Sequence, residues 1–143
     1  MIKVGKVSSL FYSPSTGRTV VNSFDLDCKG IISDKHYNKS INRSVLITSL
    51  DSYTLAKNNG INVPYGALGE NILIDYNPYH LTAGTKLKIG KVILEINQAC
   101  TLCKSLTTID SKLPKLLKDD RGIFAKVIDD GSIKEDDDIY LLD

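Results

Sequence analysis

Residues 85–97 read Thr-Lys-Leu-Lys-Ile-Gly-Lys-Val-Ile-Leu-Glu-Ile-Asn. Leu87 and Ile89 lie on one face of the first half, and Val92, Leu94 and Ile96 lie on one face of the second half, on either side of Gly90. Two short alternating runs that flank a glycine are typical of a β-hairpin. We therefore predict two antiparallel strands, over Thr85–Ile89 and Lys91–Asn97.

Similar short runs recur along the chain, bounded by Gly, Pro, Asn and Asp. They predict further strands over Lys3–Tyr12, Arg18–Val21, Phe24–Cys28, Arg43–Thr48, Asn71–Ile74 and Ile139–Leu142. The alternation of apolar residues with aspartate from Phe24 onward places Cys28 on the buried face of its strand. The segment Gly122–Val127 is compatible with either a strand or a helix.

Helical signals are fewer. Ser49 or Asp51 is suited to cap a helix over Ser52–Asn59, and a shorter helical turn is predicted over Leu113–Leu117. Many short strands need closure to protect their edges. The predicted fold is therefore mainly β, a closed or partly open β-barrel with one or two short helices, in which residues 1–143 form a single domain.

The bulk composition narrows the classes of function. The 143 residues are 42% hydrophobic and 24% charged, within the globular range, and a net charge of +1 argues against nucleic-acid binding. No apolar run approaches the ~20 residues of a membrane span, and residues 1–6 lack the features of a signal peptide. We therefore expect a cytoplasmic protein whose three cysteines are reduced thiols.

The motif Cys100-Thr101-Leu102-Cys103 is the first candidate for chemistry. Such a motif can be half of a zinc site, a redox pair or two packing thiols. Zinc would need two more ligands, and the remaining candidates, Cys28, His36 and His80, are scattered along the chain. A thioredoxin-like site would need a βαβ context, which the predicted elements do not provide.

Other short motifs accompany this pair of cysteines in a fixed order. They are residues 30–36 (Gly-Ile-Ile-Ser-Asp-Lys-His), 43–46 (Arg-Ser-Val-Leu), 66–74 (Gly-Ala-Leu-Gly-Glu-Asn-Ile-Leu-Ile) and 121–127 (Arg-Gly-Ile-Phe-Ala-Lys-Val). In this order, the segments resemble the MOSC family, named for the C-terminal domain of molybdenum cofactor sulfurase. The resemblance runs from about Lys3 to Leu142.

The first part of the family pattern, G-x-x-G-D-x-H, falls on residues 30–36. Ser33 stands in place of the second glycine, and Asp34 and His36 match the remaining positions. The arginine that opens the next strand of the family falls on Arg43.

The family pattern continues into the second half of the chain. Its G-E-N motif falls on residues 69–71 and its hairpin on residues 83–90. The cysteine that ligates molybdenum in the amidoxime-reducing relatives falls on Cys103, and Asp136 replaces a glycine near the end.

The resemblance implies binding of the molybdenum cofactor, in its molybdopterin form, with Cys103 as the molybdenum ligand or as the thiolate that carries sulfur. A soft thiolate suits both tasks, and nearby cations would favour its ionised form. Candidate cations, which could also meet the cofactor phosphate, are Lys35, Arg43, Lys104 and Arg121. Further candidates for cofactor contacts are His36, Thr48, Ser49 and, for the pterin edge, Asn71.

Each of these residues also has a structural interpretation. In this interpretation the arginines form surface ion pairs, His36 is a hydrogen-bonding hub, and Asn71 orders a turn. Glu70 has no obvious acid–base partner in the sequence and is expected to stabilise its loop, and Cys100 is as well suited to packing as to a resolving role.

Two activities agree with the resemblance: reduction of N-hydroxylated compounds with an external electron donor, and carriage of sulfur or cofactor without turnover. Expected partners are proteins of molybdenum cofactor biosynthesis or molybdoenzymes, with neither nucleic acid nor membrane. The alternatives are a non-catalytic module that delivers or senses the cofactor, and a thiol redox protein that uses Cys100 and Cys103.

Overall fold

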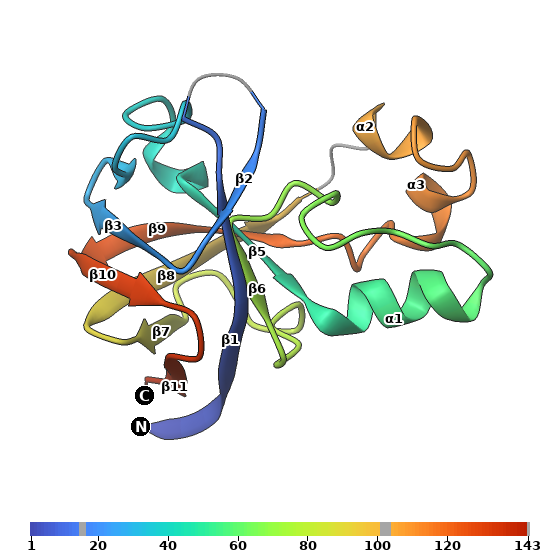
Figure 1. Cartoon of the computed structure of the whole chain (residues 1–143). Helices are drawn as coiled ribbons and strands as arrows, with labels where there is room; N and C mark the ends of the chain where they lie inside the picture. Colours follow the sequence, from blue (N-terminus) through green and yellow to red (C-terminus); the bar gives the residue numbers. More distant parts are fainter. Residues whose placement is uncertain (15–16, 101–103, 143) are drawn as a thin grey trace.

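A computed structural model describes residues 1–14, 17–100 and 104–142 of the chain. Its larger sheet has the strand order β11 (Asp138–Leu141), β7 (Lys86–Ile89), β8 (Val92–Ala99), β9 (Ile123–Asp129), β5 (Val45–Ser49), β6 (Ile72–Ile74), β1 (Ile2–Tyr12) and β2 (Thr19–Val21). Strand β1 also pairs with β11, which closes seven of these strands into a barrel. The predicted mainly β fold is therefore confirmed, and the barrel is closed (Figure 1).

A second, three-stranded sheet has the order β10 (Gly131–Lys134), β3 (Ser23–Asp27) and β4 (Gly30–Ile31). Phe24 and Leu26 of β3 are buried, as their alternation predicts. Cys28 is exposed, so its predicted place in the core is wrong. The reason is that β3 ends at Asp27 and the chain turns into β4 before the alternation reaches the cysteine.

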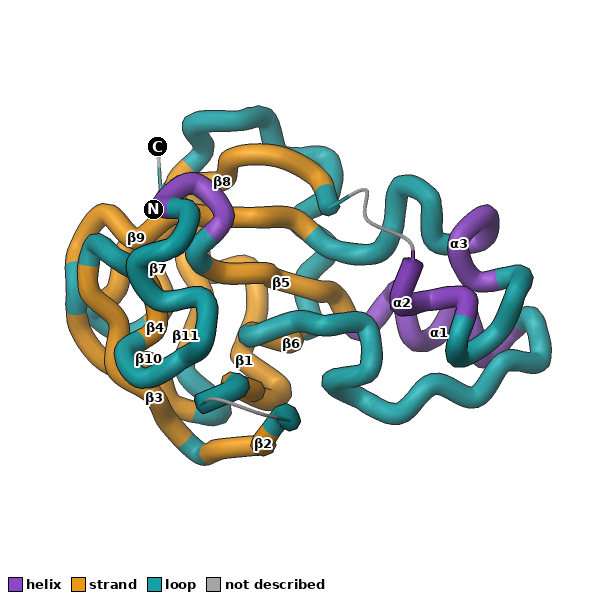
Figure 2. Tube along the Cα trace, turned by 90° about the horizontal axis from the view of Figure 1, so that it is seen from above, coloured by secondary structure: helices purple, strands orange, loops and turns teal. Residues whose placement is uncertain are grey.

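Strands β5 and β6 pair in parallel, with Ile47 opposite Ile72. Parallel neighbours need a long crossover connection, which α1 (Leu50–Asn58) and the loop of residues 59–71 supply. Helices α2 (Lys104–Thr107) and α3 (Leu113–Leu116) lie on the same side of the barrel as α1 in both views, away from β3 and β10 (Figures 1 and 2).

Two apolar clusters hold these layers together. The first fills the barrel and includes Ile47, Leu87 and Leu94. The second joins the barrel wall to the helices, with Leu73 packed in the same cluster as Leu113. Each fully buried leucine or isoleucine contributes roughly 1.5–3 kcal/mol relative to an exposed side chain.

The ends of several elements decide where polar side chains lie. Ser49 caps α1, as predicted, because its Oγ accepts a hydrogen bond of 3.1 Å from the Asp51 N–H. A short 3-10 helix, η1 (Ile41–Arg43), precedes β5, so Arg43 lies outside the strand predicted to contain it. The segment that is ambiguous in sequence, Gly122–Val127, is largely strand β9.

Candidate functional site

A pocket of about 160 Å³ lies where β8 ends and where β5, β6 and β9 begin. An outer pocket of about 260 Å³ shares three of its residues, His36, Arg43 and Phe124, and adds Lys39 and Ser40. The inner pocket is lined by Arg18, His36, Arg43, Ser44, Leu46, Gly69, Asn71, Cys100, Arg121 and Phe124. We call the inner and outer hollows together the cationic pocket.

Positive charge dominates this pocket. Three arginines and Lys39 contribute to its lining, and no carboxylate is among the lining residues that the structure describes. The guanidinium carbon of Arg43 lies 4.5 Å from the ring centroid of Phe124, a cation–π contact that holds an exposed side chain at the rim. An anionic ligand with oxygen acceptors suits such a lining, because guanidinium groups bind phosphate through paired hydrogen bonds.

Arg121 is held deep in the pocket and is only 8% exposed. Its Nε donates a hydrogen bond of 3.2 Å to the Leu68 carbonyl, and its own carbonyl accepts one of 2.8 Å from the buried Thr48 hydroxyl. Gly69 has φ of +93°, and a Cβ at this position would lie 3.6 Å from Arg121 Nη2. The loop before β6 therefore passes close to the guanidinium group.

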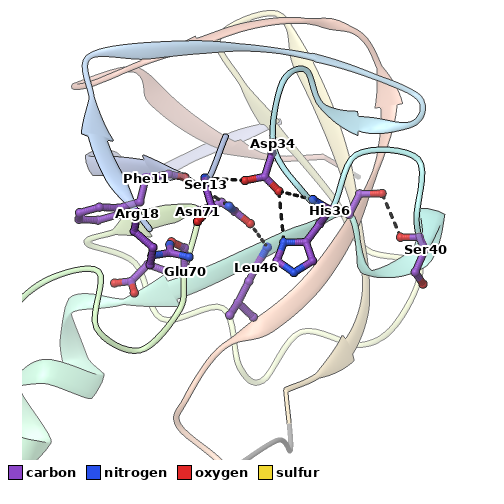
Figure 3. A network of polar contacts seen from close by, with 10 residues as sticks. Phe11, Ser13, Arg18, Asp34, His36, Ser40, Leu46, Glu70 and Asn71 are labelled. Atoms are coloured by element: carbon purple, nitrogen blue, oxygen red, sulfur yellow. Dashed lines mark hydrogen bonds and ion pairs between the residues drawn. The ribbon is translucent and has the colours of Figure 1, made fainter. Parts of the chain in front are cut away.

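Asn71 bridges two strands of the barrel. Its Oδ1 accepts a hydrogen bond of 3.0 Å from the Leu46 N–H, and its Nδ2 donates one of 3.2 Å to the Phe11 carbonyl (Figure 3). A side-chain amide has two donor hydrogens and two acceptor lone pairs. Asn71 thus joins β5 to β1 and keeps one donor and one acceptor position for a ligand in the pocket that it lines.

Asp34 and His36 form a second polar unit, at the edge of the pocket. The buried Asp34 carboxylate accepts hydrogen bonds from the backbone N–H of Ser13 (2.7 Å) and of His36 (2.9 Å). The same carboxylate lies 3.2 Å from His36 Nδ1 (Figure 3). The loop between β4 and η1 is therefore fixed by a carboxylate that also orients the imidazole ring.

A buried pair, Glu70 and Tyr53, lies behind the pocket. The Tyr53 hydroxyl donates a hydrogen bond to Glu70, and Arg18 donates one to the Glu70 carbonyl. Burial raises the pKa of the Glu70 carboxyl group, and burial followed by the nearby Glu70 charge raises the pKa of Tyr53. The sequence indicated no partner for Glu70, because Tyr53 lies on α1, 17 residues earlier in the chain.

Cys100 brings a thiol to the pocket at the point where the chain leaves β8. It is 4% exposed, and its N–H donates a hydrogen bond of 2.9 Å to the Gly122 carbonyl. Cys103, the predicted molybdenum ligand, lies outside the described residues, as does the side chain of Lys104. Among the described residues, no three His, Cys, Asp or Glu side chains are grouped so that they could hold a metal ion.

The pocket thus gathers four of the predicted site residues: His36, Arg43, Asn71 and Arg121. The other three predicted site residues that the structure describes do not line the pocket. The Lys35 side chain is exposed and its N–H donates to the Ser13 carbonyl, Thr48 is hydrogen-bonded to Arg121, and Ser49 caps α1.

Sequence reasoning gave no role to several other members of the lining, among them Arg18, Lys39 and Phe124. Phe124 could have been found from the alternation in β9, where Ile123 and Ala125 face the core and the phenylalanine between them faces outward. Arg18 carries no comparable signal, because it lies outside any strand, directly before β2.

A family model of the MOSC domain matches residues 33–140, about three quarters of the chain. The chain belongs to the MOSC domain family. The MOSC match includes Asp34, His36, Arg43, Asn71 and Arg121, so most of the cationic pocket is built from the part of the chain that defines the family.

Crystal structures of other proteins share this MOSC fold. The YUAD protein from Bacillus subtilis is similar with a TM-score of 0.81 and 17% identity, over 95% of this chain and 94% of that one. YiiM from Geobacillus stearothermophilus has a TM-score of 0.79 and 15% identity, over 97% and 75% of the two chains. YiiM from Escherichia coli has a TM-score of 0.73 and 17% identity, over 96% and 70%.

A search of curated proteins found no significant match to this MOSC chain. None of the helices among the described residues is long and apolar enough to cross a membrane.

Proposed function

We propose that this MOSC domain binds the molybdenum cofactor in the cationic pocket and handles its molybdenum or its sulfur through the thiolate of Cys103. One observation carries the proposal: arginine side chains and the Cys100 thiol line the same small pocket. Cys103 follows Cys100 by three residues, and three peptide links span at most about 11 Å. This short spacing in the sequence supports a role for Cys103 beside a ligand held by the arginines.

The residues present suit the chemistry of molybdopterin. Its phosphate needs several charged donors and no competing carboxylate, which is how the described lining is composed. Its pterin edge offers donors and acceptors together, and Asn71 keeps one of each. The inner pocket alone is small, whereas the inner and outer hollows together reach the lower end of the volume range of known ligand sites.

Each residue of the proposed site has a distinct task. Arg43 and Arg121 would bind the phosphate, one from the rim and one from the depth of the pocket. Asn71 would orient the pterin, and His36 would contact the ligand from the edge that it shares with Arg43. Thr48 would support the site by holding Arg121.

Two further predicted residues complete the proposal. Lys35, next to His36 in the sequence, would add positive charge, and Ser49 would fix the start of α1 at the far end of β5. Their side chains do not line the two hollows, so substitutions at these positions are expected to weaken cofactor binding less than substitution of Arg43 or Arg121.

The cofactor, when bound, would supply a molybdenum centre for two-electron chemistry or a sulfur atom for transfer. The chain would supply binding, orientation and the thiolate ligand. Two activities follow: reduction of N-hydroxylated compounds with electrons from an external donor, and carriage of sulfur or cofactor to a molybdoenzyme or to a protein of cofactor biosynthesis. A reducing compartment such as the cytoplasm suits both, because each needs a thiolate.

The test is to express the chain in cells that make the molybdenum cofactor and to measure bound molybdenum and pterin in the purified protein. We expect wild type to retain both, and Cys103→Ala to lose molybdenum. The matched control is Cys28→Ala, which removes an exposed thiol that does not line the pocket and should leave both contents unchanged.

Two other results would have different meanings. A persulfide on Cys103 in protein without molybdenum would indicate sulfur carriage. A wild-type protein that retains neither molybdenum nor pterin and bears no persulfide would contradict the proposal, and a reversible disulfide between Cys100 and Cys103 in that protein would favour a thiol redox role.

A further inference from the structure

The loop after β4 holds His36 in one orientation at the cationic pocket. The Asp34 side chain is 3% exposed, and its Oδ2 lies 3.2 Å from His36 Nδ1. A carboxylate only accepts hydrogen bonds, so Nδ1 is the ring nitrogen that carries the proton in this contact. Backbone hydrogen bonds from Ser13 and His36 fix the carboxylate, and through it the ring.

The other ring nitrogen, Nε2, does not take part in the contact with Asp34 and is available to a ligand in the pocket. The His36 side chain is 60% exposed and contributes to both the inner and the outer hollow. Figure 3 shows Asp34 against one edge of the ring, with the second ring nitrogen directed away from it. In the neutral ring this nitrogen is an acceptor, and in the protonated ring it is a donor.

The other charged groups that face His36 are mainly permanent cations. Arg18, Arg43 and Arg121 share the inner pocket with it, and Lys39 shares the outer pocket. Arginine does not release its proton in proteins, whereas imidazole exchanges one near neutral pH. Among the described lining residues, His36 is therefore the one whose side chain is an imidazole, a group that can both accept and donate a proton.

We propose that His36, oriented by Asp34, is the catalytic proton donor of the cationic pocket. This inference rests on the proposed function and selects the reductive activity within it. Reduction of an N-hydroxylated compound cleaves the N–O bond, takes up two electrons and two protons, and yields the N–H compound and water. The electrons come from an external low-potential donor. The protonated ring of His36 gives its Nε2 proton to the departing oxygen and returns to the neutral form with its proton on Nδ1, and water supplies the second proton and reprotonates the ring.

The first test needs neither cofactor nor turnover. The chain contains two histidines, His36 and His80, so long-range proton–nitrogen NMR of nitrogen-15-labelled protein resolves each imidazole. His36→Gln assigns the signals. The exposed His80, which contacts Tyr76 and no carboxylate of the described residues, is the internal reference. We expect neutral His36 to carry its proton on Nδ1 in wild type and to populate both tautomers in Asp34→Asn. A wild-type ring protonated on Nε2 would overturn the proposal.

The second test uses the molybdenum-loaded protein, with reduced methyl viologen as electron donor and N-benzylhydroxylamine as substrate. We expect His36→Gln to lower kcat by about 10²–10⁴-fold, with little change in KM and with a pH profile that differs from that of wild type. Asp34→Asn should lower kcat less, and His80→Gln should match wild type. Circular dichroism checks that Asp34→Asn is folded. If Asp34→Asn is unfolded, the rate and pH profile of His36→Gln alone decide whether His36 is the proton donor.

The outcomes separate the two proposals. If wild type and His36→Gln both retain molybdenum and show the same rates and pH profile, His36 is not the proton donor and cofactor binding stands. If loaded wild type does not reduce the substrate at all, the proposed catalytic role is overturned, and the molybdenum and pterin contents still decide cofactor binding. If wild type retains neither molybdenum nor pterin and bears no persulfide on Cys103, both proposals fail.

Discussion

The Tyr53 hydroxyl donates a hydrogen bond of 2.5 Å to the Glu70 carboxyl group, between α1 and the loop that precedes β6. The same hydroxyl accepts a hydrogen bond of 3.0 Å from the Gly66 N–H. One buried phenol therefore holds both ends of residues 66–70, the segment that passes Arg121 at Gly69 and leads into Asn71. The hydrogen-bonded pair of Tyr53 and Glu70 therefore helps to set the position of Gly69 and Asn71 in the wall of the cationic pocket.

Tyr53→Phe is expected to lower the free energy of unfolding by about 1–3 kcal/mol, because it leaves the buried Glu70 carboxyl group and the Gly66 N–H without their common partner. Urea denaturation followed by circular dichroism measures the change. Tyr65→Phe is the matched control: Tyr65 is exposed and its ring contacts Tyr53 edge-on, so loss of its hydroxyl should change stability by less than about 0.5 kcal/mol. Equal effects of the two substitutions would contradict this role of Tyr53.

Glu70→Gln is expected to become more stable relative to wild type as the pH rises. Burial raises the pKa of Glu70, so the folded chain binds this proton more tightly than the unfolded chain does. The contribution of Glu70 to stability is therefore complete below the ordinary glutamate pKa and is lost as the pH rises through the raised value. Glutamine keeps an acceptor for Tyr53 and has no charge to bury.

Chemical denaturation of Glu70→Gln and wild type at several pH values between about 4 and 8 measures this difference. A difference in unfolding free energy that stays constant, or that moves in favour of wild type at higher pH, would show that Glu70 is not held in the way described.

Asn71→Ala is expected to lower the unfolding free energy by about 2 kcal/mol or more, because the Leu46 N–H and the Phe11 carbonyl would both lose a buried partner. Asn62→Ala, at an exposed asparagine of the loop after α1, serves as control and should remain within about 0.5 kcal/mol of wild type. Thermal melts of both variants decide the point. Comparable melting temperatures for the two would mean that Asn71 does not join β1 to β5 in solution.

Ser33→Gly is expected to stabilise the protein by about 0.5–1 kcal/mol. Ser33 has φ of +74°, a left-handed conformation that costs a residue with a Cβ about 1–2 kcal/mol and that glycine adopts freely. At Ser40, where φ is −140°, glycine should instead be neutral or slightly destabilising. A lower melting temperature for Ser33→Gly than for wild type would contradict the assigned strain.

Local alternation allowed most strands to be predicted from the sequence. The hairpin of β7 and β8 follows from its pattern on both sides of Gly90, and the cap of α1 follows from Ser49. Very short elements escaped prediction, because β4 has two residues and leaves no period to detect. Cys28 was misplaced because alternation does not show where a strand ends.

Part of the candidate site was also predicted, from family motifs and not from local alternation. Family motifs indicated His36, Arg43, Asn71 and Arg121, and the barrel brings these four to one pocket. Contacts between distant segments were not predictable, such as the one between Tyr53 and Glu70, because a single sequence does not show which loops the barrel brings together.

The pairing of Ile2 with Leu141 places the first and last strands of the described chain side by side, as both overall views show (Figures 1 and 2). A short linker could therefore join the two ends, and new ends could be opened at the exposed turn of Asn59 and Gly60 without cutting a strand. The same adjacency would let the barrel be inserted into a surface loop of another protein, because its ends would re-enter the host close to where they left it.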